Sequence, residues 1–291
     1  MPDNSHVART IAFERSATNA LREDSPEIIS VWPQRDAGQS SSIRIPHYGK
    51  NIEQAPDGPR GRNSSGQFEP ARREKEMVPY NLEQASWYDS INFEDDFESA
   101  VDERGQMMRE MVLDVRQQQI KHIFNQLSAR NASETNWTIA NDAADVSDFV
   151  REPLNAIQRF AGGMIAPMGF ITPAVHTLWK TFDETLVSID NNMEKPLGMG
   201  YTQKSFNYWG VNWMVTSLLP GANTANTKGF VVIPQSCVFV NGYERTDVKE
   251  DGNAQQMWHV SMQKRFTFGV QDPLGVAVIN FSDNLAKSTT A

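Results

Sequence analysis

The most regular hydrophobic pattern in the chain runs from Asn92 to Arg130. Its apolar residues recur at the three- and four-residue spacing of one helical face: Phe93, Phe97, Val101, Met108, Met111, Val112, Val115, Ile120, Ile123, Phe124 and Leu127. Asn92 is a good N-cap, and the acidic residues at 94–96 suit the first turn of a helix. We therefore predict a helix of about 37 residues and about 55 Å, with Gly105 as the place where a kink or a break can occur.

Extended segments precede this helix. IISVW, residues 28–32, is β-branched and aromatic, and SIRIPHY, residues 42–48, alternates with a period of two. A further extended segment, EMVPYNLEQASWYDSI, covers residues 76–91. These patterns predict a long β-hairpin whose strands and tip together span residues 28–90.

The tip of the predicted hairpin, residues 51–75, has an unusual composition. It holds three glycines, three prolines and nine charged residues, with only Ile52 and Phe68 as large apolar side chains. Such a segment cannot build a core, and a loop of this length is usually disordered or acts through contacts outside its own domain. Basic residues alternate with acidic ones in it, which suits contact with a protein surface of mixed charge. A solvated flexible loop is the alternative interpretation.

The chain after residue 130 mixes helical and strand patterns. Residues 131–150 form a polar connector in which TNWTIA, 135–140, reads as a short strand. We expect helices at 145–163 and 174–189, around a short buried strand in MIAPMGFITP, 164–173. The remaining strand-like segments are FNYWGVNWMVTSLLP (206–220), GFVVIPQSCVFVNGYE (229–244) and MWHVSMQKRFTFGVQDPLGVAVINF (257–281). The patterns together predict an α+β protein with two long projections.

The composition argues against several classes of protein. The 291 residues carry a net charge of −9 with 39% hydrophobic residues, which argues against a basic nucleic-acid-binding surface. The single cysteine, Cys237, excludes an internal disulfide framework. The sequence contains no apolar run long enough to span a membrane and no signal-peptide pattern. We expect a soluble cytoplasmic product.

The search for chemistry finds no catalytic, metal or cofactor motif. The five histidines lack metal-ligand spacing, and solvated or core roles are expected for His122 and His176. Cys237 lies in an apolar run and is interpreted as a small buried hydrophobe. GGMIAPMG lacks the lysine and serine of a phosphate loop, and no G-x-S-x-G occurs. No enzymatic activity is predicted.

The order of these segments resembles the major capsid protein of tailed bacteriophages, the Hong Kong 97 fold. The resemblance covers nearly the whole chain in order and pattern, and it is most specific in YWGVNWMVTSLLPGANTANTKGFVVIPQSCVFVNG and MQKRFTFGVQDPLGVAVINF. It implies an N-terminal arm, an extended β-hairpin loop, a long spine helix, a peripheral β-domain and an α/β axial domain. The corresponding ranges are 1–27 for the arm, 28–90 for the loop, 91–140 for the spine helix and the start of the peripheral domain, 141–235 for the axial domain and 236–291 for the closing strands and C-terminus.

The resemblance implies a shell protein that assembles through hexamers and pentamers into an icosahedral head around double-stranded DNA. Candidate inter-subunit contacts are Arg60, Arg62, Phe68, Arg72 and Arg73 in the loop and Asn223 and Asn226 in the axial-domain turn. A separate scaffolding protein, or none, is expected, because few residues precede the loop; portal and decoration or cement proteins complete the expected partners. The protein would reside in the virion after assembly in the host cytoplasm.

Two other functions remain open. An encapsulin, a related bacterial shell that encloses an enzyme cargo, would have the same order of segments. A hydrolase or transferase with a mobile lid at residues 51–75 is the third interpretation, although no site supports it.

Overall fold

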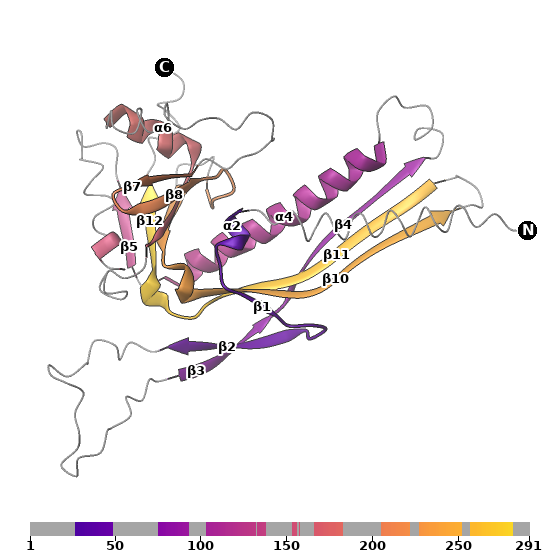
Figure 1. The fold of residues 1–291 in the computed structure, drawn as a ribbon, viewed down its shortest axis with the longest axis horizontal. Coiled ribbons are helices and arrows are strands. Elements are labelled where there is room, and N and C mark those ends of the chain that lie inside the picture. The colour runs from indigo at the N-terminus through magenta and orange to yellow at the C-terminus, as the bar shows by residue number, and fades with distance from the viewer. Residues whose placement is uncertain are drawn as a thin grey trace, which may run out of the picture. The chain divides into compact units, whose positions relative to one another are not determined.

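The computed structural model describes residues 27–48, 75–92, 103–131, 133–137, 153–155, 157, 166–182, 205–221, 227–251 and 257–281. They form a mixed α+β fold in which strands predominate (Figure 1). The chain divides into two compact units. The first unit comprises Met1–Ile43, Tyr80–Ile123 and Phe239–Phe268, and the second comprises Arg44–Pro79, Phe124–Val238 and Gly269–Ala291.

The first unit is built on a sheet with the strand order β1-β10-β11-β4 among the described strands. Its strands are β1 (Gln34–Asp36), β10 (Cys237–Asp251), β11 (Met257–Val270) and β4 (Glu83–Asn92). β1 runs parallel to β10, and β4 runs antiparallel to β11. In β11, Val260 and Met262 are buried and their neighbours Ser261 and Gln263 are not, which is the pattern of a strand with one face in the core, whereas residues 266–270 are all buried.

Helix α4 (Glu103–Ala129) lies alongside the long strands in Figure 1. Its buried side chains repeat at three- and four-residue intervals, as predicted, and include Met111, Val115, Ile120 and Ile123. The His122 ring meets Phe266 of β11 edge-on, with centroids 5.4 Å apart. This confirms the helix and its apolar stripe over the described range of 27 residues, about 40 Å long.

The predicted start of the helix at Asn92 is wrong. Asn92 is the last residue of β4, where it lies opposite Met257 of β11. Pairing with a strand that is distant in sequence therefore overrides the local preference of asparagine for a helix cap. Gly105 lies near the start of the described helix.

The predicted strand IISVW is also wrong. Residues 27–30 form a single helical turn, α2 (Glu27–Ser30), in which Ile28 and Ile29 are buried. Trp32 follows, 2% exposed, and packs edge-on against Phe268 at 5.0 Å. A short apolar run does not by itself distinguish a strand from a buried helical turn. In the folded chain the helical turn buries Ile28 and Ile29, and Trp32 is buried beside it.

The hairpin predicted over residues 28–90 is shorter in the structure. Among the described strands, β2 (Ser42–Tyr48) and β3 (Lys75–Asn81) form a two-stranded sheet, whereas β1 and β4 belong to the sheet of the first unit. SIRIPHY is confirmed as a strand, and residues 76–91 are confirmed as extended except at Leu82.

The second unit contains a sheet with the order β5-β12-β9-β6-β8-β7 among the described strands. The strands are β5 (Ser133–Trp137), β6 (Met168–Ile171), β7 (Ser205–Tyr208), β8 (Val211–Val215), β9 (Thr227–Val232) and β12 (Val276–Phe281). β6 and β9, near the centre, are nearly fully buried, as expected of strands covered on both faces.

Helix α6 (Pro173–Phe182) packs on this sheet through Trp179, which meets Trp213 of β8 edge-on with centroids 4.9 Å apart. The predicted strand in 164–173 and the predicted helix in 174–189 are thus confirmed where they are described. Of the predicted helix at 145–163, residues 153–155 and 157 are described and are helical.

The segment 236–291, assigned to one region by the sequence, is divided between the units. β10 and β11 lie mainly in the first unit, whereas β12 pairs with β9 and β5 in the second. Two short 3₁₀ turns, Pro234–Ser236 and Pro273–Gly275, adjoin β10 and β12, and the Ser236 hydroxyl donates to the carbonyl of Ile233 at 2.6 Å. The other predicted domain borders remain predictions.

Candidate functional site

The seven predicted contact residues fall outside the described part of the chain. Arg60, Arg62, Phe68, Arg72 and Arg73 belong to residues 49–74, and Asn223 and Asn226 belong to residues 222–226. The structure therefore describes the bases that carry these two segments rather than the segments themselves.

The base of the first segment is the β2–β3 sheet. On β2, Ile45 is fully buried, and Nη1 of Arg130 lies 3.4 Å from Nε2 of His47. Burial, and then the positive charge of Arg130, lower the pKa of His47, while Glu76 acts in the opposite direction. A neutral imidazole can accept a hydrogen bond from Arg130, so this contact holds β2 near the end of α4 within the second unit.

The base of the second segment is a closed turn. The backbone N–H of Lys228 donates to the carbonyl of Pro220 at 3.1 Å, and the Thr227 hydroxyl donates to the carbonyl of Gly221 at 2.9 Å. Nζ of Lys228 also donates to the Ser128 hydroxyl at 2.8 Å. Both ends of residues 222–226 are thus held together on the second unit.

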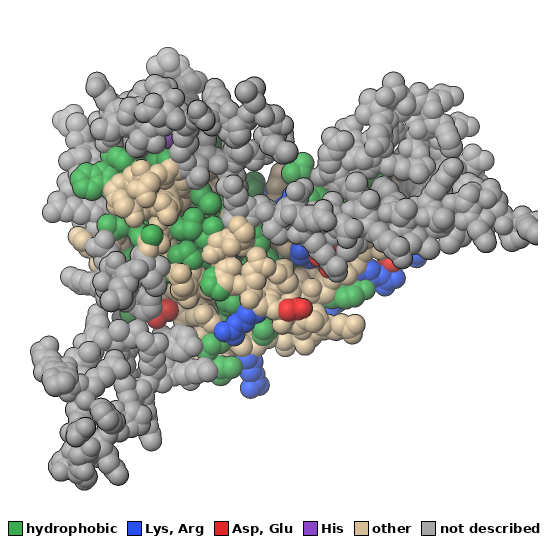
Figure 2. Space-filling model, in the orientation of Figure 1, with side chains coloured by type: hydrophobic (Ala, Val, Ile, Leu, Met, Phe, Trp, Pro, Cys, Tyr) green, Lys and Arg blue, Asp and Glu red, His purple; other side chains and the backbone are tan. Residues whose placement is uncertain are grey.

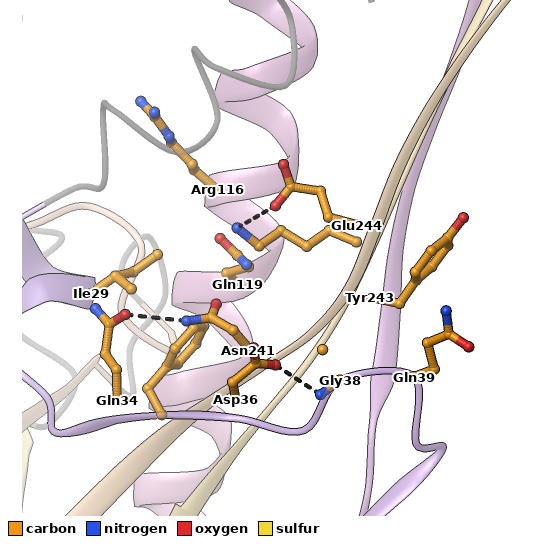
Figure 3. A pocket seen from close by; sticks show the side chains of 13 residues that line it. Ile29, Gln34, Asp36, Gly38, Gln39, Arg116, Gln119, Asn241, Tyr243 and Glu244 are labelled. Atoms are coloured by element: carbon orange, nitrogen blue, oxygen red, sulfur yellow. Dashed lines mark hydrogen bonds and ion pairs between the residues drawn. The ribbon is translucent and has the colours of Figure 1, made fainter. Parts of the chain in front are cut away.

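A pocket of about 570 Å³ opens in the first unit (Figure 3). It is lined from β1 by Gln34 and Asp36, from α4 by Arg116 and Gln119, and from β10 and β11 by polar residues that include Asn241, Glu244 and Lys264. Carboxamides and charges of both signs therefore line it, and a polar ligand suits it better than an apolar one.

The polar groups of this pocket largely pair with one another. Nδ2 of Asn241 donates to Oε1 of Gln34 at 3.1 Å, and Nζ of Lys264 lies 3.4 Å from a carboxylate oxygen of Glu244. Gln119 is 2% exposed, and its Nε2 has no hydrogen-bond partner among the described residues. The described lining contains no histidine, cysteine or serine, and its ionisable side chains are those of Asp36, Arg116, Tyr243, Glu244 and Lys264.

The structure confirms the interpretation of Cys237 as a small buried side chain. It is fully buried, and burial raises the pKa of its thiol to about 12, with a smaller contribution in the same direction from Asp272. A thiol this far from ionisation is not a nucleophile near neutral pH.

His122 and His176 occupy core positions, 7% and 5% exposed. His176 packs on Phe206 with ring centroids 4.8 Å apart. Within the described residues, no group of three or more potential ligands is placed to hold a metal ion.

On the face drawn in Figure 2, the described lysine and arginine side chains are scattered, and described aspartate and glutamate side chains lie on the same face. Of the described helices, none is both long and apolar enough to cross a membrane.

Two features of the fold were not predicted from the sequence. The pocket joins residues from five elements, α2, β1, α4, β10 and β11, which no local pattern reveals. The turn at Trp209-Gly210 was read as part of one strand-like segment, although a glycine between two alternating runs signals a turn.

Comparison with known proteins gives matches at the level of structure. No protein-family model and no curated protein matches the chain. The capsid of the cyanophage P-SCSP1u matches with a TM-score of 0.59 at 13% identity, over 87% of this chain and 87% of that chain.

Other shells match as well. A virus-like particle from Pyrococcus furiosus matches with a TM-score of 0.61 at 8% identity, over 93% of this chain and 99% of that one. The SrpI encapsulin of Synechococcus elongatus matches with a TM-score of 0.56 at 9% identity, over 87% and 86%. The chain therefore has the Hong Kong 97-type fold of phage capsids, as its order of segments predicted.

Proposed function

We propose that this chain is a major capsid protein, a structural subunit that assembles through hexamers and pentamers into an icosahedral phage head around double-stranded DNA. The observation that carries the proposal is the likeness to shell-forming chains over most of the length of both partners, 87% of each in the case of the cyanophage capsid. Because this likeness extends over nearly the whole fold, a shared mode of assembly is the simplest explanation for it.

The β2–β3 sheet supports the proposal. Its base is buried within the subunit through Ile45, whereas residues 51–74 between the two strands carry few apolar side chains with which to build a core of their own. A neighbouring subunit supplies the missing surface. The contact residues proposed for it are those predicted from the sequence: Arg60, Arg62, Phe68, Arg72 and Arg73 on the loop, with Asn223 and Asn226 at the axial turn.

The charge of the chain supports an enclosing role. A net charge of −9 and the scattered basic residues of Figure 2 suit a wall that faces DNA without binding it tightly. A separate scaffolding protein, a portal and decoration or cement proteins are the partners that we propose, with assembly in the host cytoplasm.

An encapsulin-type shell with an enzyme cargo is the second candidate. The observation that favours it is the likeness to the SrpI encapsulin of Synechococcus elongatus, which has a TM-score of 0.56 over 86% of that chain. The two candidates share the shell and differ in what it encloses.

Expression of the chain, followed by sedimentation velocity and negative-stain microscopy, tests the shell. We expect closed particles, and a variant without residues 52–74 should stop at capsomers or smaller species. Arg72→Glu should weaken assembly more than Lys249→Glu, an equal charge change at an exposed residue of β10. A chain that stays monomeric with and without a co-expressed scaffolding protein contradicts the proposal.

The contents of the particles separate the two candidates. Nuclease-resistant double-stranded DNA in particles from infected cells supports the phage head. A co-purifying enzyme inside DNA-free particles, identified by mass spectrometry, supports the encapsulin instead.

A further inference from the structure

The turn between β7 and β8 has an unusual residue at its tip. Tyr208 pairs with Val211, so Trp209 and Gly210 form a two-residue hairpin loop with φ angles of 54° and 72°. Positive φ at both positions is the signature of a type I′ turn, for which asparagine followed by glycine is strongly preferred. Trp209 is the one non-glycine residue with positive φ in the described part of the chain.

The tryptophan is therefore held in an unfavourable conformation. A bulky aromatic residue at positive φ is an outlier, because its Cβ is crowded by the backbone there. Such outliers persist where the surroundings impose them, and they cluster at sites that serve a function. The local sequence contains asparagines on both sides, at 207 and 212, but not in the turn position that favours them.

More than half of the surface of Trp209 is left without packing in the subunit. The Trp209 side chain is 55% exposed, and its described ring contact is an edge-on one with Tyr208, at 6.2 Å. The second tryptophan of the hairpin, Trp213, is fully buried and donates its indole N–H to the carbonyl of Tyr208 at 3.1 Å. One tryptophan thus anchors the hairpin to the core, while the other is presented outward.

The base of the turn is held by hydrogen bonds. Nδ2 of Asn207 donates across the hairpin to Oδ1 of Asn212 at 2.8 Å, and the backbone of β8 pairs with β6 on its other side. A rigidly presented aromatic side chain loses little conformational entropy on binding, which is why tryptophan is enriched among the residues that dominate protein interfaces.

The surroundings of Trp209 identify the kind of partner. Asn207, Gly210 and Asn212 are exposed beside it, and Ser205–Val215 contains no charged residue. An aromatic residue with an uncharged polar rim matches the composition of a protein interface. Nucleic acid would require lysine or arginine for its phosphates, and these two strands supply none.

We propose that Trp209 anchors the β7–β8 turn to a second copy of this chain. The inference rests on the proposed function, because in a shell of identical subunits the protein surface that repeatedly meets this turn belongs to another copy. β7 is also the edge strand of its sheet among the described strands, so no described strand of the subunit covers that side of the hairpin. Binding of the indole by the neighbour offsets the strain of the turn.

Trp209→Asn tests the role of the side chain, because the two consequences of this change have opposite signs. Asparagine suits the first position of a type I′ turn, so the dissociated subunit should melt at the same temperature or higher. Assembly should be weakened, with a rise of about tenfold or more in the subunit concentration needed for half-assembly. Trp209→Phe, which keeps an aromatic ring in the same turn, serves as the matched variant. Its concentration for half-assembly should lie between those of the wild-type chain and Trp209→Asn.

Oxidative footprinting tests the contact directly. Trp209 should be oxidised in dissociated subunits and protected in empty particles, while buried Trp179 and Trp213 serve as internal controls. Assembly of Trp209→Asn at the wild-type concentration, or equal oxidation of Trp209 in both states, overturns the proposal.

Three further outcomes are informative. Protection of Trp209 in DNA-filled particles alone would assign it to nucleic acid and overturn the contact between copies. A lower melting temperature of the dissociated Trp209→Asn subunit would assign the indole to packing within the chain, with the same consequence. If the wild-type chain forms no particles, the proposed function fails; if particles form and Trp209 stays exposed, the shell stands and this inference alone fails.

Discussion

Nδ1 of His122 on α4 lies 2.7 Å from a carboxylate oxygen of Glu83 on β4. The histidine side chain is 8% exposed and the glutamate 58%, so the pair joins a buried ring to the surface of the first unit. Burial lowers the pKa of His122, and the charge of Glu83 and its hydrogen bond act in the opposite direction. Nε2 of the ring has no hydrogen-bond partner among the described residues, which suits a neutral imidazole that donates from Nδ1.

This relationship predicts a loss of stability in acid. The pKa of His122 is lower in the folded than in the unfolded chain, so the unfolded chain binds more protons below the ordinary histidine value of 6.5. The free energy of unfolding should therefore fall as the pH drops from 6.5 through the folded pKa. Urea unfolding across this range should show a shallower pH dependence in His122→Leu, and an unchanged slope would contradict the assignment.

Replacement of Glu83 tests the electrostatic part of the same pair. Glu83→Gln removes the charge that raises the pKa of His122, so that pKa should fall further below its ordinary value. NMR titration of the imidazole measures it. Glu76→Gln is the matched control, because Glu76 raises the pKa of His47 and should shift that histidine instead. A higher pKa of His122 in Glu83→Gln would be incompatible with this account.

The close approach of β6 to β8 predicts intolerance of a methyl group at Gly169. A Cβ at this position would collide with the ring of Trp213, which is fully buried. Gly169→Ala should lower the free energy of unfolding by about 1–3 kcal/mol, because a packed core has no space for the added atom. The cost should shrink when Trp213→Leu is also present, and strictly additive effects in chemical denaturation would refute the steric explanation.

The environment of Cys237 predicts an unreactive thiol. With a pKa of about 12 and complete burial, it should not react with a thiol reagent at about pH 8 in the folded chain. In concentrated guanidinium the same thiol should be modified rapidly. Stoichiometric modification under native conditions, followed by mass spectrometry, would show that the β10 strand opens.

The ion pair in the pocket predicts a cost for removing one partner. Lys264 and Glu244 are each 13% exposed, so Glu244→Gln would leave the ammonium group with little water and no countercharge. We expect a loss of about 1–3 kcal/mol in the free energy of unfolding. Asp247→Asn, which breaks the more exposed pair with Arg245, is the control and should cost less. Equal losses in the free energy of unfolding of the two variants would show that burial of the Lys264–Glu244 pair does not increase its contribution to stability.

Local hydrophobic patterns were sufficient to predict helix or strand wherever an element buries one face and exposes the other. The apolar stripe of α4 and the alternation of SIRIPHY predicted the right conformation, because the periods of helix and strand differ. The composition of residues 51–75 and the order of segments likewise pointed to the capsid fold, which the structural matches confirm.

The predictions were wrong where tertiary contacts determine the local conformation. Asn92 is a strand residue because it pairs with Met257, and Glu27–Ser30 forms a helical turn in which Ile28 and Ile29 are buried. The loop contacts at Arg60 to Arg73 and the turn contacts at Asn223 and Asn226 remain predictions.

The amino-acid sequence by itself determined the period and burial of the main elements, since those depend on neighbours along the chain. The tertiary structure alone decided which strands pair and how the pocket is lined. The physical reason is that these features depend on contacts between residues far apart in sequence, whose free energy outweighs local preference.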